Sequence, residues 1–387
     1  MKRLLTFLIT LFASIWVIGR QIERLVNRVD RSKPLPKPSQ KALNLHKNNP
    51  VADVHNDTLL FERDFSKRST IGHIDLPRAE DAGVNLLVFA AATQIPRGTN
   101  AEQTDDSKSD VLKFIYGSRF SPQTFMTPFE RAKHQAKRLQ QLAQRSNGRM
   151  HVVRTKSDLD PATHGRSLGA ILAFEGAQAV GDRVANINEL FDLGYRVAGY
   201  SHFIDNRYAH SAHGLSKAGL TNDGRQLTKR CIALGMALDL AHLSATGIDD
   251  VLEIISNTPL LVSHTGLRGF LDNNRNIYDH QAVEIAKRGG LVGIGFWEET
   301  VGDNTPEAIV DGIQYAIDLL GEDHVCFGSD FDGAIRPSFD ISQLTVLTHI
   351  MLERGMSEVT IKKVIGGNAF RFFKTVLPSS NGKNLAK

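Results

Sequence analysis

Seven histidine and acidic side chains stand where short apolar runs of this sequence end. They are His55, Asp57, Glu175, His202, His242, His264 and Asp330. Taken singly, each has an ordinary explanation, such as a capping aspartate in a turn or a histidine hydrogen-bonded in the core. His55 and Asp57 are more specific, because residues two apart in an extended chain point to the same side and can bind one ion.

Together these seven side chains predict a metal site, because converging imidazoles and carboxylates lose hydration that a cation would replace. The donors are nitrogen and oxygen, which suit Zn²⁺, or Mn²⁺, Co²⁺ or Fe²⁺, better than a structural zinc finger. There are enough donors for two ions, in which case one acidic residue has to bridge them. Glu175 stands between the others in barrel order, so it is the candidate bridge.

Cysteine does not contribute to the predicted site. Only Cys231 and Cys326 are present, each within an apolar stretch, so a disulfide framework and a cysteine-rich zinc site are both excluded by count. We predict that both are buried free thiols.

Eight apolar runs have to position the candidate ligands. They are Val51–Val54, Asn85–Ala91, Ala170–Phe174, Arg196–Tyr200, Met236–Leu240, Leu260–Ser263, Leu291–Phe296 and Val325–Gly328. Most lack polar alternation, which is typical of strands buried on both faces of a parallel sheet. The amphipathic segments between them predict helices, which include Phe129–Ser146, Ile187–Leu193, Gln226–Leu234, Gly247–Ser256, His280–Lys287 and Glu307–Leu320.

This alternation predicts an α/β fold, a single (β/α)₈ TIM barrel over residues 50–377 with its active site at the carboxyl ends of the strands. A doubly wound open sheet is the alternative, but the sequence has no GxGxxG or Walker pattern to support it. The polar stretch Thr93–Thr127 is expected to be an insertion after the second strand. His210 and His213 follow the fourth strand, in a segment that we interpret as a loop.

In order and context, the motifs resemble those of the membrane dipeptidase (renal dipeptidase) family of zinc metallopeptidases, which have an amidohydrolase-like barrel. The resemblance covers roughly residues 50–375. It rests on Asp53-Val54-His55-Asn56-Asp57, Phe174-Glu175-Gly176, Tyr200-Ser201-His202, Leu238-Asp239-Leu240-Ala241-His242-Leu243-Ser244, Val262-Ser263-His264, Arg275-Asn276, Gly328-Ser329-Asp330-Phe331-Asp332-Gly333 and Gly366-Gly367-Asn368.

The resemblance implies a role for each motif residue. His55 and Asp57 would bind one zinc ion, His242 and His264 the other, and Glu175 would bridge them. Asp330 would be the catalytic acid and base. Substrate would be bound by His202 at its carbonyl group and by Arg275 at its carboxylate, with Asn276 beside Arg275.

The predicted function is that of a dinuclear zinc dipeptidase, in which a hydroxide bridging the metals attacks the peptide bond. Two alternatives stay open. One is another amidohydrolase reaction at the same site, such as that of a lactonase, an N-acyl amino acid hydrolase or a deaminase. The other is a metal-binding protein without catalytic activity. Relatives in the family are often dimers, so a homodimer is also an open expectation.

The basic charge of the chain belongs to its first 40 residues. The net charge is +4, but residues 1–40 carry eight basic and two acidic side chains, so the remaining residues carry −2. Without a long basic patch in that remainder, nucleic acid is not an expected partner.

A leader is expected at the N-terminus, because a basic start precedes the apolar run Leu4–Gly19. This pattern is typical of a signal peptide or signal anchor, which predicts an exported domain, periplasmic or extracytoplasmic, with membrane attachment through the N-terminal segment. The opposite orientation stays open, because Arg20, Arg24 and Arg28 follow the run directly. The expected division is a leader over 1–32, a Pro- and Lys-rich linker over 33–49, the barrel over 50–377 and a disordered tail over 378–387.

Overall fold

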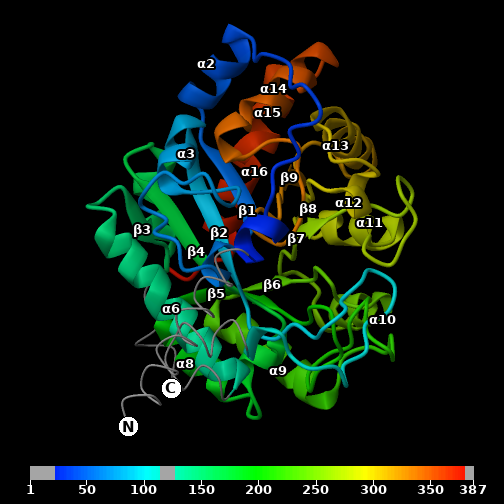
Figure 1. The fold of residues 1–387 in the computed structure, drawn as a ribbon. Helices are drawn as coiled ribbons and strands as arrows, with labels where there is room; N and C mark the ends of the chain where they lie inside the picture. The colour runs from blue at the N-terminus through cyan, green and yellow to red at the C-terminus, as the bar shows by residue number, and fades with distance from the viewer. Residues whose placement is uncertain (1–21, 114–126, 380–387) are drawn as a thin grey trace, which may run out of the picture.

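The computed structural model describes residues 22–113 and 127–379, which form a nearly closed barrel of eight parallel strands within a layer of helices (Figure 1). The barrel strands are β1 (Val51–Asn56), β2 (Val84–Ala92), β4 (Leu168–Glu175), β5 (Tyr195–Gly199), β6 (Ala237–Asp239), β7 (Leu261–Thr265), β8 (Leu291–Ile294) and β9 (Val325–Phe327). They pair in this order, and Asn56 forms a parallel bridge with Phe331 that brings β1 beside the end of β9. The predicted TIM barrel is confirmed, and each predicted run overlaps one barrel strand.

Helices connect the strands and cover the barrel. They are α2 (Gln40–Asn48), α3 (Leu76–Asp81), α6 (Pro128–Arg145), α7 (Asp160–Thr163), α8 (Asn186–Leu193), α9 (Asn222–Leu234), α10 (Ala245–Ile254), α11 (Asp279–Lys287), α12 (Glu298–Val301), α13 (Pro306–Leu320), α14 (Thr345–Glu353), α15 (Glu358–Lys362) and α16 (Asn368–Val376). All six predicted helices are present. Thr127 and Ser244 cap the starts of α6 and α10 by accepting backbone N–H bonds, and left-handed Gly194 and Gly235 end α8 and α9.

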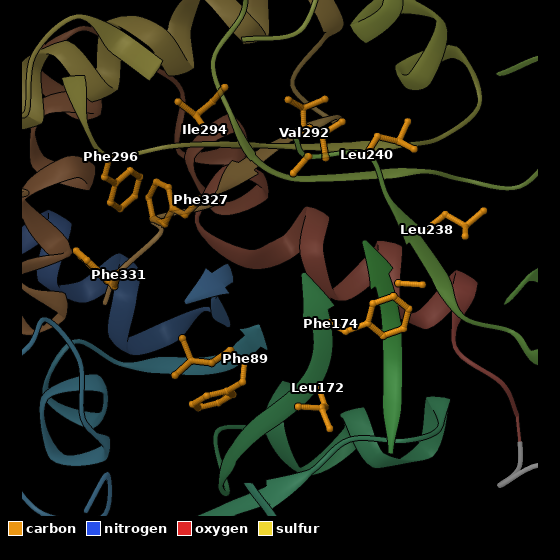
Figure 2. Close-up of a cluster of buried hydrophobic side chains, with 14 of the residues drawn as sticks. Phe89, Leu172, Phe174, Leu238, Leu240, Val292, Ile294, Phe296, Phe327 and Phe331 are labelled. Carbon is orange, nitrogen blue, oxygen red and sulfur yellow. The ribbon is translucent and has the colours of Figure 1, made fainter. Parts of the chain in front are cut away.

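The apolar core has two layers. One cluster takes members from all eight barrel strands, including Val54, Val88 and Ile171, and side chains from all eight strands can meet only inside the barrel. The larger cluster lies between the strands and the surrounding helices. Figure 2 shows part of it, with Phe89, Phe174 and neighbouring apolar side chains of the strands. Ala173 and Glu175 share the inward face of β4 because they are two residues apart, so this strand carries Glu175 to the barrel mouth.

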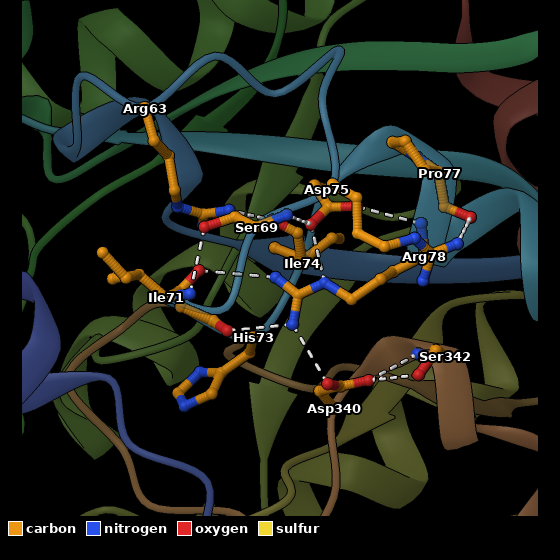
Figure 3. A network of polar contacts seen from close by, with 12 residues as sticks. Arg63, Ser69, Ile71, His73, Ile74, Asp75, Pro77, Arg78, Asp340 and Ser342 are labelled. Atoms are coloured by element: carbon orange, nitrogen blue, oxygen red, sulfur yellow. Dashed lines mark hydrogen bonds and ion pairs between the residues drawn. The ribbon is translucent and has the colours of Figure 1, made fainter.

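The loops at the mouth are joined by buried ion pairs. Arg78 bonds Asp75 (Nε to Oδ2, 2.7 Å) and Asp340 (Nη1 to Oδ2, 3.0 Å), as Figure 3 shows. Asp75 also caps the start of α3. Because Asp340 follows β9 in sequence, this network holds the connection after β1 against the one after β9, on either side of the barrel closure.

The structure differs from the expected division at the N-terminal side. Residues 33–49 are not simply a linker, because α2 lies within them and packs its buried Ala42 and Leu45 against the body of the protein. Residues 22–26 form a helical turn, and the chain after it is joined to the barrel by hydrogen bonds. The apolar run Leu4–Gly19 lies outside the described residues. None of the helices within the described ranges is long and apolar enough to cross a bilayer.

Three smaller features differ from the prediction or are only partly described: an additional short strand, the insertion after β2 and the C-terminal tail. A short strand, β3 (Met150–Val152), pairs with β4 outside the barrel order. The described part of the insertion after β2, residues 93–113, runs along the barrel mouth, while residues 114–126 lie outside the description. Of the expected tail, Pro378 still accepts a hydrogen bond from Lys156, and residues 380–387 lie outside the description. Cys231 and Cys326 are buried free thiols, as predicted.

Candidate active site

The strand ends bring the predicted metal ligands to one point, with Glu175 at its centre. Glu175 Oε1 lies 3.1 Å from His242 Nε2, 3.3 Å from His264 Nε2 and 3.6 Å from His55 Nε2. The other oxygen, Oε2, lies 3.6 Å from His202 Nε2. A single carboxylate at the end of β4 therefore faces four imidazoles that four other strands supply.

The remaining acidic side chains lie on the His55 side. His55 Nε2 is 3.9 Å from Asp57 Oδ2 and 3.8 Å from Asp330 Oδ1. On the other side, His242 Nε2 and His264 Nε2 are 3.0 Å apart. Donor atoms within 4.8 Å of one another form three sets with the spacing of metal sites. They are His55–Asp57–Asp330, His55–Glu175–His264 and Glu175–His202–His242.

The donor atoms fit a cation. All of these side chains are buried, and His55 Nε2, Asp57 Oδ1 and Glu175 Oε2 find no hydrogen-bond partner within the described part of the chain. Buried polar atoms of this kind are costly unless another group compensates them. Nitrogen and carboxylate oxygen around a shared point are the donors that Zn²⁺ and related ions take in open catalytic sites.

Burial sets the charge of the individual groups. It raises the pKa values of Glu175 and Asp330 well above their ordinary range, an effect that the nearby Asp57 carboxylate reinforces. It lowers the pKa values of His202, His242 and His264 well below theirs, which keeps these imidazoles neutral.

His55 behaves differently. Burial lowers its pKa, but the carboxylates of Glu175, Asp57 and Asp330 more than offset this and raise it to about 10. Positive charge is therefore favoured between these acidic groups, where a metal ion would supply it.

Ser263 and His213 orient the imidazoles, and sequence reasoning assigned a role to neither. Ser263 Oγ lies 2.8 Å from His264 Nδ1 and 3.1 Å from His55 Nδ1, so one hydroxyl can accept from both rings. His213 Nδ1 donates to the Ala101 carbonyl (2.7 Å), so its Nε2 accepts from His242 Nδ1 (2.9 Å). In each case the Nε2 lone pair of the predicted ligand is left facing the site.

Arg275 and Asn276, predicted together as substrate contacts, do different things. Arg275 lines the central cavity. Its Nη2 donates to the His264 carbonyl (2.7 Å), while Nη1 has no partner among the described residues. Asn276 bonds backbone groups instead, accepting from Gly266 N (2.8 Å) and donating to Leu271 O (2.8 Å). The Asn276 side chain thereby holds the loop that presents Arg275, and the substrate contact expected of Asn276 stays a prediction.

Trp297, which follows β8, also borders the site. Its ring lies 5.0 Å from the Arg275 guanidinium carbon and 6.1 Å from the His264 ring. A tryptophan after an apolar run has no distinctive sequence pattern, which is why sequence reasoning did not identify it.

Two residues of the site adopt a backbone conformation that side chains rarely accept. His242 has φ +61° and Asp330 φ +60°, both in the left-handed region, although neither is glycine. Such strain persists only where the surrounding structure imposes it, and it concentrates at functional sites.

A cavity of about 540 Å³ opens above these side chains. Asp57, Glu175, His202, Arg275 and Asp330 line its polar floor. The volume suits a small molecule rather than a folded protein or a long polymer.

Comparison with known proteins agrees with this geometry. The sequence model described as "Membrane dipeptidase (Peptidase family M19)" matches residues 39–386. The dipeptidase verJ of Clonostachys rogersoniana is 27% identical over 352 residues, which cover 87% of this chain and 86% of that protein.

Solved structures of metallopeptidases are similar as well. A metallopeptidase from Rhodobacter sphaeroides, liganded with a phosphinate mimic of the dipeptide L-Ala-D-Ala, has a TM-score of 0.71 and 26% identity over 85% of this chain and 99% of that one. The dipeptidase AC, a metallopeptidase of family M19, gives a TM-score of 0.72 and 26% identity over 86% of this chain and 99% of that one.

Proposed function

The chain belongs to the membrane dipeptidase family, peptidase family M19, and on this premise we propose that this dipeptidase hydrolyses its substrates at a centre of two zinc ions. His55 and Asp57 hold one ion in this proposal, His242 and His264 hold the other, and Glu175 bridges them. The observation that carries it is the position of Glu175, whose Oε1 lies within 3.6 Å of one histidine of the first set and both of the second.

When bound, two such ions would lower the pKa of water enough to supply a hydroxide nucleophile at neutral pH. The residues of the chain then complete the site. Asp330 takes a proton from the nucleophile and passes it to the leaving amine. Burial raises the pKa of Asp330 well above that of an exposed aspartate, which makes it a better proton acceptor than an exposed carboxylate.

His202 and Arg275 hold the substrate in this proposal. His202 is neutral because burial lowers its pKa, so one ring nitrogen carries a hydrogen and can donate it to the oxygen of the scissile carbonyl. Arg275 Nη1, which has no partner among the described residues, points to a role with an anionic group, and the C-terminal carboxylate of a dipeptide is the matching partner. The dipeptide mimic in the Rhodobacter sphaeroides enzyme supports a substrate of this size.

Metal analysis combined with a substrate panel tests the proposal. We expect purified protein to contain two metal ions per chain and to cleave simple dipeptides, including some with a D-residue at the C-terminal position. A single ion per chain would contradict the dinuclear centre. Hydrolysis of lactones or N-acyl amino acids without hydrolysis of dipeptides would assign another amidohydrolase reaction to the same site.

A further inference from the structure

The cavity above the metal ligands is closed on one side by the chain's own N-terminal segment. Ile22 and Val26 line it together with Asp57, Glu175 and Asp330, although they lie far from these residues in sequence. In Figure 1 this segment is the darkest blue ribbon, which lies over the middle of the barrel before the chain continues to α2.

Buried polar contacts hold the segment in place. Glu23 is only 3% exposed, and its Oε1 accepts from Arg63 Nε at 2.6 Å. Arg63 also pairs with buried Asp332, two residues beyond Asp330. Glu23, Arg63 and Asp332 therefore form a buried series of ion pairs. It connects the N-terminal segment to the loop that contains Asp330, the proposed acid and base.

Residues 27–33 of the segment are also bound to the loops of the barrel mouth, by hydrogen bonds and an ion pair. Asn27, also 3% exposed, accepts from Ala334 N at 2.9 Å, and Asp30 N donates to the Pro337 carbonyl at 2.8 Å. Lys33 pairs with Asp303 at 2.5 Å. Attachment at so many points makes residues 22–33 a fixed part of the barrel mouth.

The helical turn exposes two different faces. Ile22 and Val26 are four residues apart and point the same way, into the cavity. There, Val26 packs against a small apolar cluster that includes Leu60, Phe61 and Leu112. Leu25 of the same turn does not line the cavity and is 60% exposed.

We propose that Ile22 and Val26, with Phe61 and Leu112, form an apolar wall that binds an apolar side chain of the dipeptide and so sets substrate specificity. The inference rests on the proposed function, because the polar floor engages the peptide bond and the carboxylate. A large apolar side chain of the dipeptide, such as leucine, would be buried against this wall and stabilise the complex. The methyl group of alanine buries much less apolar area, so it would stabilise the complex less.

Val26 offers a direct test of the wall. We expect Val26→Ala to lower the ratio of kcat/KM for Leu-Leu to that for Ala-Ala by about tenfold, mainly through KM for Leu-Leu, as loss of one or two methyl groups from an apolar pocket does. Val26→Thr keeps the shape of the side chain but replaces one methyl group by a hydroxyl, so it should lower the same ratio. Leu25→Ala and Leu25→Thr are the matched controls, since they alter the exposed face of the same turn.

A wild-type ratio in both Val26 variants would overturn the proposal. Calorimetric titration with phosphinate mimics of Leu-Leu and Ala-Ala gives the same comparison without turnover. If the wild-type protein cleaved neither dipeptide, the proposed function would fail, while the affinities for the two mimics would still decide whether Val26 selects the larger side chain.

Discussion

Asp330 is buried beside His55, and its backbone has a left-handed conformation. Both the position of its side chain and its backbone are therefore fixed by the surrounding structure. Its position allows two roles. It belongs to one of the donor sets that could hold a metal ion, and it also lines the cavity where substrate would bind. A conservative variant separates these roles.

We expect Asp330→Asn to keep both metal ions and lower kcat by about 10²- to 10⁴-fold, the usual contribution of general acid–base catalysis. The amide keeps the shape of the side chain but cannot take up a proton. Metal content by elemental analysis and kcat for a simple dipeptide check this. Loss of an ion would make Asp330 a ligand instead, and full activity would remove it from the mechanism.

His213 acts on the site through His242, because its Nε2 accepts the Nδ1 hydrogen of that predicted ligand. Partners of this kind typically contribute 10- to 100-fold to metal affinity by fixing the orientation of the ligand. We therefore expect His213→Ala to weaken zinc binding by about that factor, and His213→Gln, which retains an acceptor, to restore part of it.

Competition titration with a zinc chelator measures this effect without reference to activity. His210→Ala is the matched control, since His210 lies in the same loop but its Nδ1 bonds the Gly219 carbonyl instead. Equal zinc affinities for the His213→Ala and His210→Ala variants would contradict the positioning role.

Among the elements, α2 shows how the chain before the barrel is anchored. Its His46 is 3% exposed and bonds both the Ala82 carbonyl (Nδ1, 3.0 Å) and Thr348 of α14 (Nε2 to Oγ1, 2.7 Å). Burial lowers the pKa of His46 to about 4, so the folded protein holds this ring neutral.

This lowered pKa predicts a pH dependence of stability. Between about pH 6.5 and 4 the unfolded chain binds a proton at His46 that the folded chain does not, so stability falls as the pH falls through this window. Over the whole window, the lowered pKa of His46 changes the unfolding free energy by on the order of 3 kcal/mol. We expect the difference in unfolding free energy between wild type and His46→Gln to shrink over that range in urea titrations. His164→Gln, at an exposed histidine, should not change the pH slope. If the unfolding free energies of wild type and His46→Gln changed with pH at the same slope, His46 would not be the source of the pH dependence.

At the scale of elements, sequence periodicity predicted the barrel well. Buried parallel strands are continuous apolar runs, and every barrel strand has one, so their positions follow from local composition. The strand β3 was not predicted, because His151 separates its two apolar residues and Arg149 and Arg154 flank it, so no apolar run marks it in the sequence. The helix α2 was concealed by its Lys- and Asn-rich composition, and its burial depends on α14, about 300 residues later.

For the whole molecule, we propose that the barrel is exported, with the apolar run Leu4–Gly19 as its signal. Alkaline phosphatase folds into its active form only in an oxidising compartment, so a fusion after residue 40 should be active. The same fusion without residues 4–19 is the control and should be inactive. An inactive full-leader fusion would place the domain on the cytoplasmic side.

The sequence by itself determined the family, the order of the barrel strands and the identity of the histidines and carboxylates at their ends. These features depend on local composition and on motifs within a few residues of one another. Only the tertiary structure decided that His213 and Ser263 orient the predicted ligands, that the Asn276 side chain bonds backbone groups, and that Ile22 and Val26 line the central cavity. Each of these depends on a contact that the fold creates, and whether a side chain faces a cavity or a neighbouring loop leaves no periodic pattern in the sequence.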